Sequence, residues 1–241
     1  MRIASDINWS TVKAVIFDVD GTLYPQAPLR RKMLVDLVRF YALRPWRLQE
    51  MLMLRRFRAE REKRPAYAAG DLANAQYAWC AAGTSYTIPE IKQVVERWML
   101  RHPNQYLAGC MYPGTAAFFA ALQAYGIKIG IYSDYPAHDK LAAMGLPADA
   151  VVSSTDAAVD RLKPDPRGLL YLAAQFDLAP EECLFIGDRP ELDGLCAARA
   201  GMPFLLVDPA PAAGMPFFHQ LHHQLTSQVN APRYEPDIFI A

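Results

Sequence analysis

The chain has 241 residues, of which 52% are hydrophobic and 21% are charged, and its 25 basic residues balance its 25 acidic residues. This length allows one large domain or a core with a smaller insert, and the neutral balance excludes a global field that would recruit nucleic acid. No apolar stretch reaches the ~18 residues of a membrane span, and the N-terminus carries charge where a signal peptide would be apolar. Because the four cysteines are widely spaced and form no C-x-x-C pair, we expect reduced, mostly buried thiols in a cytoplasmic protein.

The order of the predicted elements indicates an α/β fold. Five short apolar runs rich in β-branched residues predict strands, at 13–18, 127–132, 150–153, 183–187 and 204–207. Helical periodicity lies between the later ones, at 115–125, 167–176 and 191–200. Nearly continuous apolar strands that alternate with helices predict a doubly wound, Rossmann-like parallel sheet covered on both faces. Ligands of such sheets bind beyond the carboxyl ends of the strands.

The interval between the first two strands contains almost no strand signal. Helical runs are predicted there at 29–43, 45–64, 71–82 and 88–101. Proline and glycine interrupt both patterns near residues 24–25 and 112–114, where we place hinges. We therefore predict a core of residues 1–23 and 113–241, an inserted all-helical cap of residues 24–112, and an extension over the core at 209–241.

The first strand ends in two carboxylates, Asp18 and Asp20, followed by Gly21 and Thr22. Alternate residues of a strand point to the same side, so both carboxylates can face one site. Two converging acids favour a cation between them, and Mg²⁺ prefers such oxygen ligands. The arrangement leaves one carboxylate free to attack an electrophile.

This stretch resembles the first motif, DxDGT, of the haloacid dehalogenase-like superfamily. Three further stretches follow in that superfamily's order. They are the strand that ends in Ser133, the sequence Lys163-Pro164-Asp165-Pro166, and the apolar strand that runs into Gly187-Asp188 with Asp193 five residues later. The resemblance covers roughly residues 13–208 and is specific to the phosphatases of the superfamily, because its dehalogenases lack the second aspartate of the first motif.

The resemblance implies a role for each motif residue. Asp18 would be the nucleophile that forms an aspartyl-phosphate, and Asp20 the general acid and base. Ser133, Lys163 and Thr22 would contact the phosphoryl group, with Lys163 also pairing with the nucleophile.

The same resemblance implies a Mg²⁺ site formed by Asp18, Asp20 through its backbone carbonyl, and Asp188. Asp193 would lie behind it and orient bound water or the lysine. Position 134 departs from the common pattern, because an aspartate stands where asparagine often follows the hydroxyl. Its charge beside a phosphate site requires either that Asp134 point away or that it meet a base such as Arg189.

The predicted cap contains the one pronounced charge asymmetry of the chain. From residue 30 to residue 64 there are twelve Lys or Arg against four Asp or Glu, a net charge of +8. A solvated helix face explains most runs of this kind. The alternatives are that the face guides an anionic substrate to the site or lies on an anionic lipid surface.

Together these features predict a Mg²⁺-dependent phosphohydrolase that acts on a small phosphorylated metabolite, as a monomer or homodimer. A sugar-phosphate mutase or a nucleotidase-like enzyme is the alternative, the latter because Leu23-Tyr24-Pro25 resembles nucleotidase-like members. A different class is an inactive protein of the same fold that binds a partner through its basic cap. Such a protein should have lost an acid or the lysine, but all of them are present.

Overall fold

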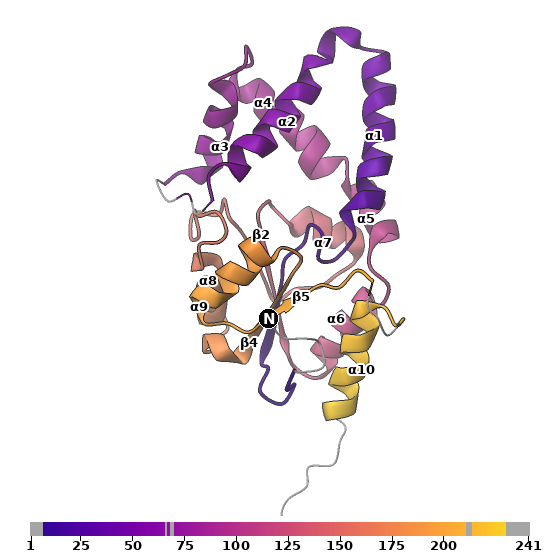
Figure 1. Cartoon of the computed structure of the whole chain (residues 1–241), viewed down its shortest axis with the longest axis vertical. Coiled ribbons are helices and arrows are strands. Elements are labelled where there is room, and N and C mark those ends of the chain that lie inside the picture. The colour runs from indigo at the N-terminus through magenta and orange to yellow at the C-terminus, as the bar shows by residue number, and fades with distance from the viewer. Residues whose placement is uncertain (1–6, 66, 68–69, 211–213, 230–241) are drawn as a thin grey trace, which may run out of the picture.

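The computed structural model describes residues 7–65, 67, 70–210 and 214–229. Its centre is a parallel five-stranded sheet in the order β3-β2-β1-β4-β5 (Figure 1). The strands are β1 (Ala14–Phe17), β2 (Lys128–Ser133), β3 (Ala150–Ser153), β4 (Cys183–Gly187) and β5 (Phe204–Leu206). Each predicted strand is present within one residue at either end, and the predicted α/β class is confirmed.

Both faces of the sheet are buried, because the strand residues alternate between two hydrophobic clusters. Val15 and Phe17 of β1 point into one cluster, and Ala14 and Ile16 point into the other. The first cluster is closed by α6 (Thr115–Ala124), α7 (His138–Met144) and α10 (Phe217–Val229). The second is closed by α8 (Arg167–Gln175) and α9 (Leu195–Ala200). This two-sided cover explains why the strands are apolar throughout.

Helix α10 belongs to the predicted C-terminal extension. It packs on α6 and buries Phe217, Phe218, Leu221 and Leu225 in the first cluster. We propose that the extension covers the core, as the packing of residues 217–229 supports, whereas residues 230–241 lie outside the described residues. Neither α10 nor α7 was predicted as a helix.

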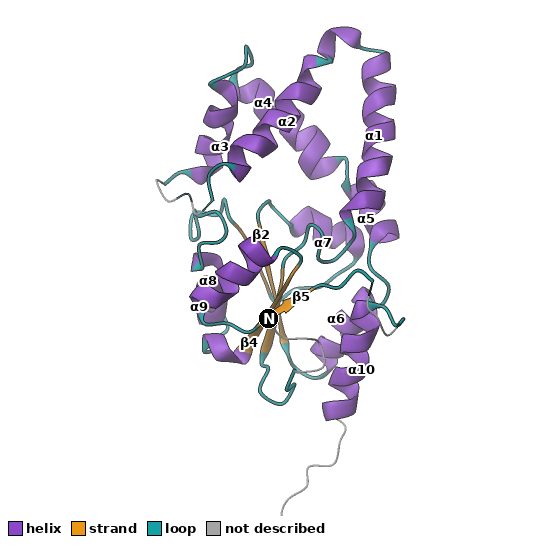
Figure 2. Ribbon diagram, viewed as in Figure 1, coloured by secondary structure: helices purple, strands orange, loops and turns teal. Residues whose placement is uncertain are grey.

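A layer of helices lies beyond the carboxyl ends of the strands (Figure 2). It contains α1 (Gln26–Ala42), α2 (Gln49–Glu62), α3 (Leu72–Ala81) and α4 (Ile88–Val95), with short helical turns at Pro45–Arg47 and Glu96–Arg101. These helices have a hydrophobic cluster of their own, centred on Tyr41, Phe57 and Trp98. The predicted insertion of an all-helical cap between the first two strands is confirmed.

We propose that the cap extends from residue 24 to residue 112, as the sequence predicts. The chain enters and leaves the cap at neighbouring points, because the backbone N–H of Tyr112 donates to the carbonyl of Leu23 at 3.1 Å. The last residues of this segment, however, pack against the core. Helix α5 (Asn104–Leu107) places Leu107 in the first cluster of the sheet, and Cys110 follows it there.

All four cysteines are buried and form no disulfide, as predicted. Within the part of the chain that the structure describes, no helix combines the length and the apolar character needed to cross a bilayer.

Candidate active site

The motif residues meet at one edge of the sheet because three strands end at the same level. Phe17 pairs with Ile131 on one side and with Ile186 on the other. Asp18 therefore follows β1 beside Ser133, the last residue of β2, and beside Asp188, which follows β4. This edge faces the cap (Figure 1).

Lys163 connects two carboxylates at the centre of the site. Its Nζ lies 2.7 Å from Oδ1 of Asp18 and 2.8 Å from Oδ1 of Asp193, and its side chain is fully buried. Burial lowers the pKa of Lys163, but the two carboxylates outweigh it and hold that pKa well above its ordinary value. The lysine is therefore a fixed positive charge beside the predicted nucleophile.

Thr22 contacts the predicted nucleophile. Its side chain is fully buried, and its hydroxyl donates to Oδ2 of Asp18 at 3.1 Å. The hydroxyl therefore orients the carboxylate of Asp18, and a contact between Thr22 and the phosphoryl group stays a prediction. The turn after β1 produces this contact, since the N–H of Thr22 bonds back to Val19.

Asp188 is the carboxylate of this cluster that forms no ion pair with a basic residue in the described part of the chain. Its Oδ1 is buried and, among the described residues, has no hydrogen-bond donor. Burial raises the pKa of Asp188 to about 6, with the Asp193 charge as a further cause. Burial also raises the pKa of Asp18, against the opposing effect of Lys163. Both shifts mean that nearby positive charge does not fully offset the cost of burying the ionised carboxylates. A divalent cation would supply the missing positive charge.

The donor set at this point suits such a cation. Asp18, Asp188 and Asp193 each offer an oxygen, and these atoms lie within 4.8 Å of one another. A Cβ on Gly21 would lie 2.0 Å from Oδ2 of Asp188, so only glycine allows the turn after β1 to approach this carboxylate. Gly21 has φ +110°, which glycine alone adopts readily.

Asp193 lies behind the other two acids. One oxygen accepts from Lys163, and the other accepts from the backbone N–H of Arg189 at 3.0 Å. Both oxygens are occupied and the residue has no exposed surface. This fits the prediction that Asp193 orients the lysine.

Asp20 points away from this acidic cluster. Its carboxylate accepts from Nζ of Lys140 at 2.7 and 2.5 Å and from the hydroxyl of Tyr24. Its side chain therefore lies outside the cluster of Asp18, Asp188 and Asp193 oxygens, and only its backbone carbonyl remains as a possible metal ligand. That carbonyl accepts from Nε2 of Gln26 at 2.7 Å. Burial raises the pKa of Asp20, but Lys140 and Tyr24 together hold it below its usual value.

Lys140 was missed by sequence reasoning. It lies on α7, seven positions after Ser133, and it is 4% exposed. A lysine in a helix is usually solvated, and helix α7 itself gave no clear periodic signal. The one available hint was its position after a strand that carries a motif.

Ser133 is fully buried at the end of β2, where its hydroxyl oxygen accepts a weak 3.4 Å bond from the N–H of Tyr135. The next residue, Asp134, meets Arg189, with 2.6 Å between Oδ2 and Nη2. This is the second of the two arrangements that the sequence allowed for Asp134. The ion pair neutralises the extra carboxylate beside the site.

The cap contacts this same loop through Arg61 of α2. The guanidinium donates to the carbonyl of Asp134 at 2.7 Å and lies 4.4 Å above the ring of Tyr135. Arg61 also bonds to Gln76 of α3 and is 6% exposed. A second contact joins the backbone N–H of Leu72 to Asp160 at 2.6 Å. One side of the cap is thereby fixed to the core.

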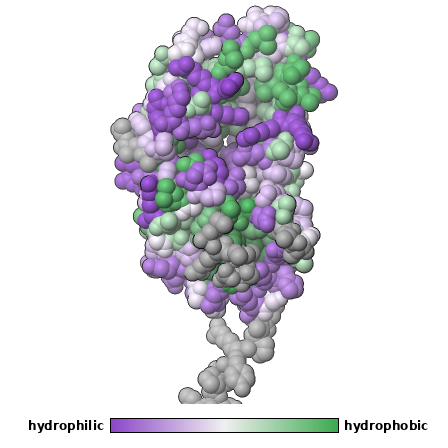
Figure 3. Space-filling view, viewed as in Figure 1, coloured by the Kyte–Doolittle hydropathy of each residue, from purple (hydrophilic) through white to green (hydrophobic). Residues whose placement is uncertain are grey.

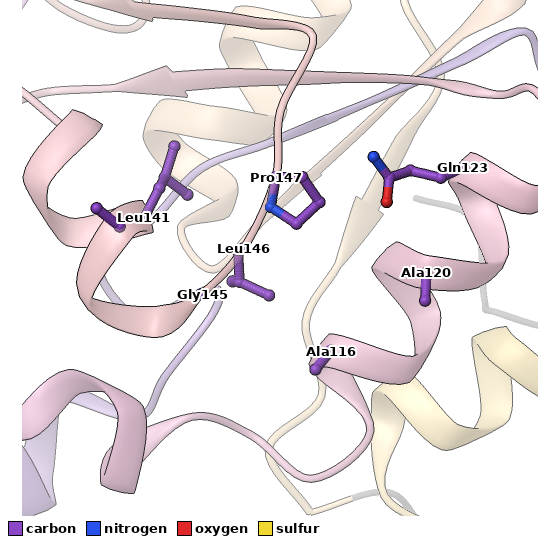
Figure 4. Close-up of a pocket in the computed structure, with 8 residues that line it drawn as sticks. Ala116, Ala120, Gln123, Leu141, Gly145, Leu146 and Pro147 are labelled. Carbon is purple, nitrogen blue, oxygen red and sulfur yellow. The ribbon is translucent and has the colours of Figure 1, made fainter.

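Two hollows of the described structure bear on the location of the site. One is lined by Gly21 and Asp188 of the predicted metal site, together with Arg30 of α1 and Tyr112. The other is an apolar groove between α6 and α7, lined by residues such as Ala120 and Leu146 (Figure 4). None of the motif residues lines that second groove, so we assign the chemistry to the first.

The site combines a doubly wound sheet, a helical cap and a buried cluster of acids with a lysine, which is an arrangement suited to phosphoryl transfer. A family model for haloacid dehalogenase-like hydrolases matches residues 12–201. A phosphoglycolate phosphatase from Rhodospirillum rubrum is 32% identical over 203 residues, covering 81% of this chain and 79% of that protein. A glyceraldehyde 3-phosphate phosphatase from Methanopyrus kandleri is 28% identical over 199 residues, covering 79% and 82%. The chain belongs to the haloacid dehalogenase-like hydrolase family, and it is an enzyme of the phosphatase type.

Solved structures share the fold. A HAD phosphatase from Thermococcus onnurineus has a TM-score of 0.57 at 24% identity, covering 91% of this chain and 98% of that one. A 2-haloacid dehalogenase from Pseudomonas syringae pv. Tomato has a TM-score of 0.57 at 19% identity, covering 90% and 99%. Because both chemistries occur on this fold, the architecture alone does not distinguish them.

Proposed function

We propose that the chain is a Mg²⁺-dependent phosphomonoesterase that removes phosphate from a small phosphorylated metabolite through an aspartyl-phosphate on Asp18. The observation that carries the proposal is the buried cluster in which Lys163 bonds to Asp18 while Asp188 has an unpaired oxygen. Acids that converge without enough basic partners are suited to a divalent cation.

In the proposed first step, a carboxylate oxygen of Asp18 attacks phosphorus and the bond to the leaving alcohol breaks. Thr22 and Lys163 hold the carboxylate in place through both of its oxygens. The ammonium of Lys163 also offsets the negative charge that develops on the phosphoryl oxygens. Ser133, at the end of β2, is placed to donate to one of those oxygens.

Asp20 would protonate the leaving oxygen and then accept a proton from the attacking water. In the structure its carboxylate accepts hydrogen bonds from Lys140 and Tyr24, and these contacts favour its ionised form. It must therefore acquire a proton and leave Lys140 before it can act as an acid. We infer that solvent supplies this proton as the substrate binds, and that the approaching leaving oxygen separates Asp20 from Lys140 and then receives the proton.

A bound Mg²⁺ would be held by Asp18, Asp188 and the carbonyl of Asp20, with Asp193 behind them. It would supply Lewis-acid stabilisation of the phosphoryl charge. We keep Asp20 in this set only through its carbonyl, because its carboxylate is occupied by Lys140.

The substrate proposal rests on the relatives' names. They act on phosphoglycolate and glyceraldehyde 3-phosphate, and a further relative from Pseudomonas aeruginosa is an N-acetylmuramic acid 6-phosphate phosphatase, 28% identical over 181 residues. All three named substrates are phosphate esters of small molecules. We propose the same broad class for this chain.

Phosphate release from a panel of sugar phosphates, phospho-acids and nucleotides, with and without Mg²⁺, tests the proposal. We expect Mg²⁺-dependent release from several members of the panel, and none with Asp18→Asn. Release that persists in Asp18→Asn, or that is equal in excess chelator, would contradict it.

A further inference from the structure

The tip of the cap is an exposed apolar surface far from the catalytic site. Eleven large apolar side chains are exposed in the described structure, and seven of them lie between residues 34 and 52. We define the cap tip by these seven residues: Leu34, Val35, Val38, Leu43, Trp46, Leu48 and Leu52. Leu43 and Trp46 are 76% and 74% exposed in the turn between α1 and α2.

The cap tip projects from the end of the molecule that is remote from the sheet (Figure 1). Figure 3 shows apolar side chains gathered at that end with hydrophilic ones around them. Helix α2 begins at the tip and ends at the core contact of Arg61, so at about 1.5 Å per residue the two ends lie about 20 Å apart. A flat surface can therefore touch the tip without meeting the core.

The charge around the cap tip has one sign. Residues 30–56 contain eight Lys or Arg and two acids, and both acids are occupied within the cap. Glu50 is buried and bonds to Tyr41 and Arg47, while Asp36 bonds to His102 and Tyr106. The charged residues of this stretch that are exposed are all basic: Arg30, Arg31, Lys32, Arg39 and Arg55.

We propose that the cap tip binds the surface of an anionic lipid bilayer. Protruding tryptophan and leucine side chains would enter the interface, and the basic ring would meet acidic head groups. This goes beyond the proposed hydrolysis and does not depend on it. A second copy of the chain fits less well, because pairing two tips would bring like charges together.

Vesicle co-sedimentation tests the proposal, with phosphatidylcholine vesicles compared with equimolar phosphatidylcholine and phosphatidylglycerol. The full chain should sediment with the anionic vesicles alone, and less so as salt increases. Replacing Arg31 and Arg39 by glutamine should weaken binding at least ~tenfold, because each basic residue near an anionic surface contributes appreciably. The double variant Leu43→Ser with Trp46→Ser should also lose binding.

A matched control uses Leu170→Ser with Met215→Ser, two exposed apolar residues outside the cap that are 41% and 43% exposed. This variant should bind as the wild type does. Trp46 provides an independent readout, because its fluorescence should shift to shorter wavelength only with anionic vesicles. Of the other three tryptophans, Trp9 and Trp98 are buried and Trp79 is partly buried beneath Arg64, so the shift should vanish when Trp46 is replaced.

Three results would overturn the proposal. One is no sedimentation of the wild type with anionic vesicles. Another is equal sedimentation of the wild type and the Leu43→Ser, Trp46→Ser variant. The third is a chain that does not bind vesicles but forms a dimer, or a complex with an acidic protein, through the cap tip. A protein and not a lipid surface would then occupy the cap tip.

Discussion

Nζ of Lys140 lies 2.7 Å from Oδ1 of Asp20, and this contact joins helix α7 to the loop after β1. It lowers the pKa of the predicted general acid and holds its carboxylate outside the cluster formed by Asp18, Asp188 and Asp193. The predicted catalytic residues and their partners thus form two separate groups. Asp18, Lys163, Asp188 and Asp193 form one, and Asp20, Tyr24 and Lys140 form the other.

Lys140→Met should move the pH dependence of catalysis. Without the ammonium, burial acts on Asp20 with less opposition, and its pKa should rise. An acid with a higher pKa stays protonated to higher pH, so the alkaline limb of kcat/KM that Asp20 causes should shift upward. Steady-state kinetics across the pH range measure this shift, and Lys140→Arg should restore part of the original profile. An unchanged profile would mean that Lys140 does not act on Asp20.

Asp20→Asn should lower kcat by ~10²–10⁴-fold, the usual contribution of a general acid or base. The fold should persist, because the amide can still accept from Tyr24. Circular dichroism checks the fold and phosphate release gives the rate. A loss below about tenfold would assign the proton transfer to another group.

Metal-free protein should lose stability as the pH rises from about 5 to about 7.5. Burial raises the pKa of Asp188 from 3.8 to about 6, and that of Asp18 in the same direction. For an acid with a raised folded-state pKa, the stabilising contribution is complete below the unfolded value and is lost as the pH rises through the folded value. Thermal unfolding with and without Mg²⁺ measures the effect.

Mg²⁺ should raise the unfolding temperature more at about pH 7.5 than at about pH 5, because protons compete for the same oxygens. Asp188→Asn is the control, since its side chain cannot ionise. This variant should show a flatter pH dependence and a weaker response to Mg²⁺. Equal responses of the variant and the wild type would remove Asp188 from the metal site.

Arg61→Met should loosen the cap on the core. The variant loses the bond to the Asp134 carbonyl and the contact with Tyr135, which should raise KM by ~10-fold or more, because hydrogen bonds of charged groups are the stronger ones. Arg58→Met, one turn away on the same helix and exposed, is the matched control. An equal rise of KM in both variants would assign the effect to the overall charge of the cap and not to the contacts of Arg61.

The sheet was predicted well from the sequence because its strands are buried on both faces. Such strands are continuous apolar runs, which stand out from the amphipathic helices between them. The cap helices were also predicted within a few residues. Helix α10 was missed because histidine and glutamine occupy most of its exposed positions and a proline-rich segment precedes it. Its buried Phe218, Leu221 and Leu225 lie at helical spacing, which was the available signal.

The site was predicted less completely, because motifs identify residues and not their partners. Arg61 was counted in a basic run, yet Met53, Phe57 and Arg61 recur every four residues on the buried side of α2. That spacing indicated that the side chain of Arg61 lies on the buried face of α2. The hydroxyl of Thr22 donates to the carboxylate of Asp18, a contact that the motif alone did not predict.

The most direct test of the central claim is to trap the phosphoryl group on the protein. Wild type, Asp18→Asn and Asp20→Asn are mixed with p-nitrophenyl phosphate and Mg²⁺, quenched in acid, digested and examined by mass spectrometry. We predict an acyl-phosphate on Asp18, sensitive to hydroxylamine, in the wild type and in Asp20→Asn, and none in Asp18→Asn. Turnover by the wild type with no such adduct, or with the phosphoryl group on another residue, would contradict the account.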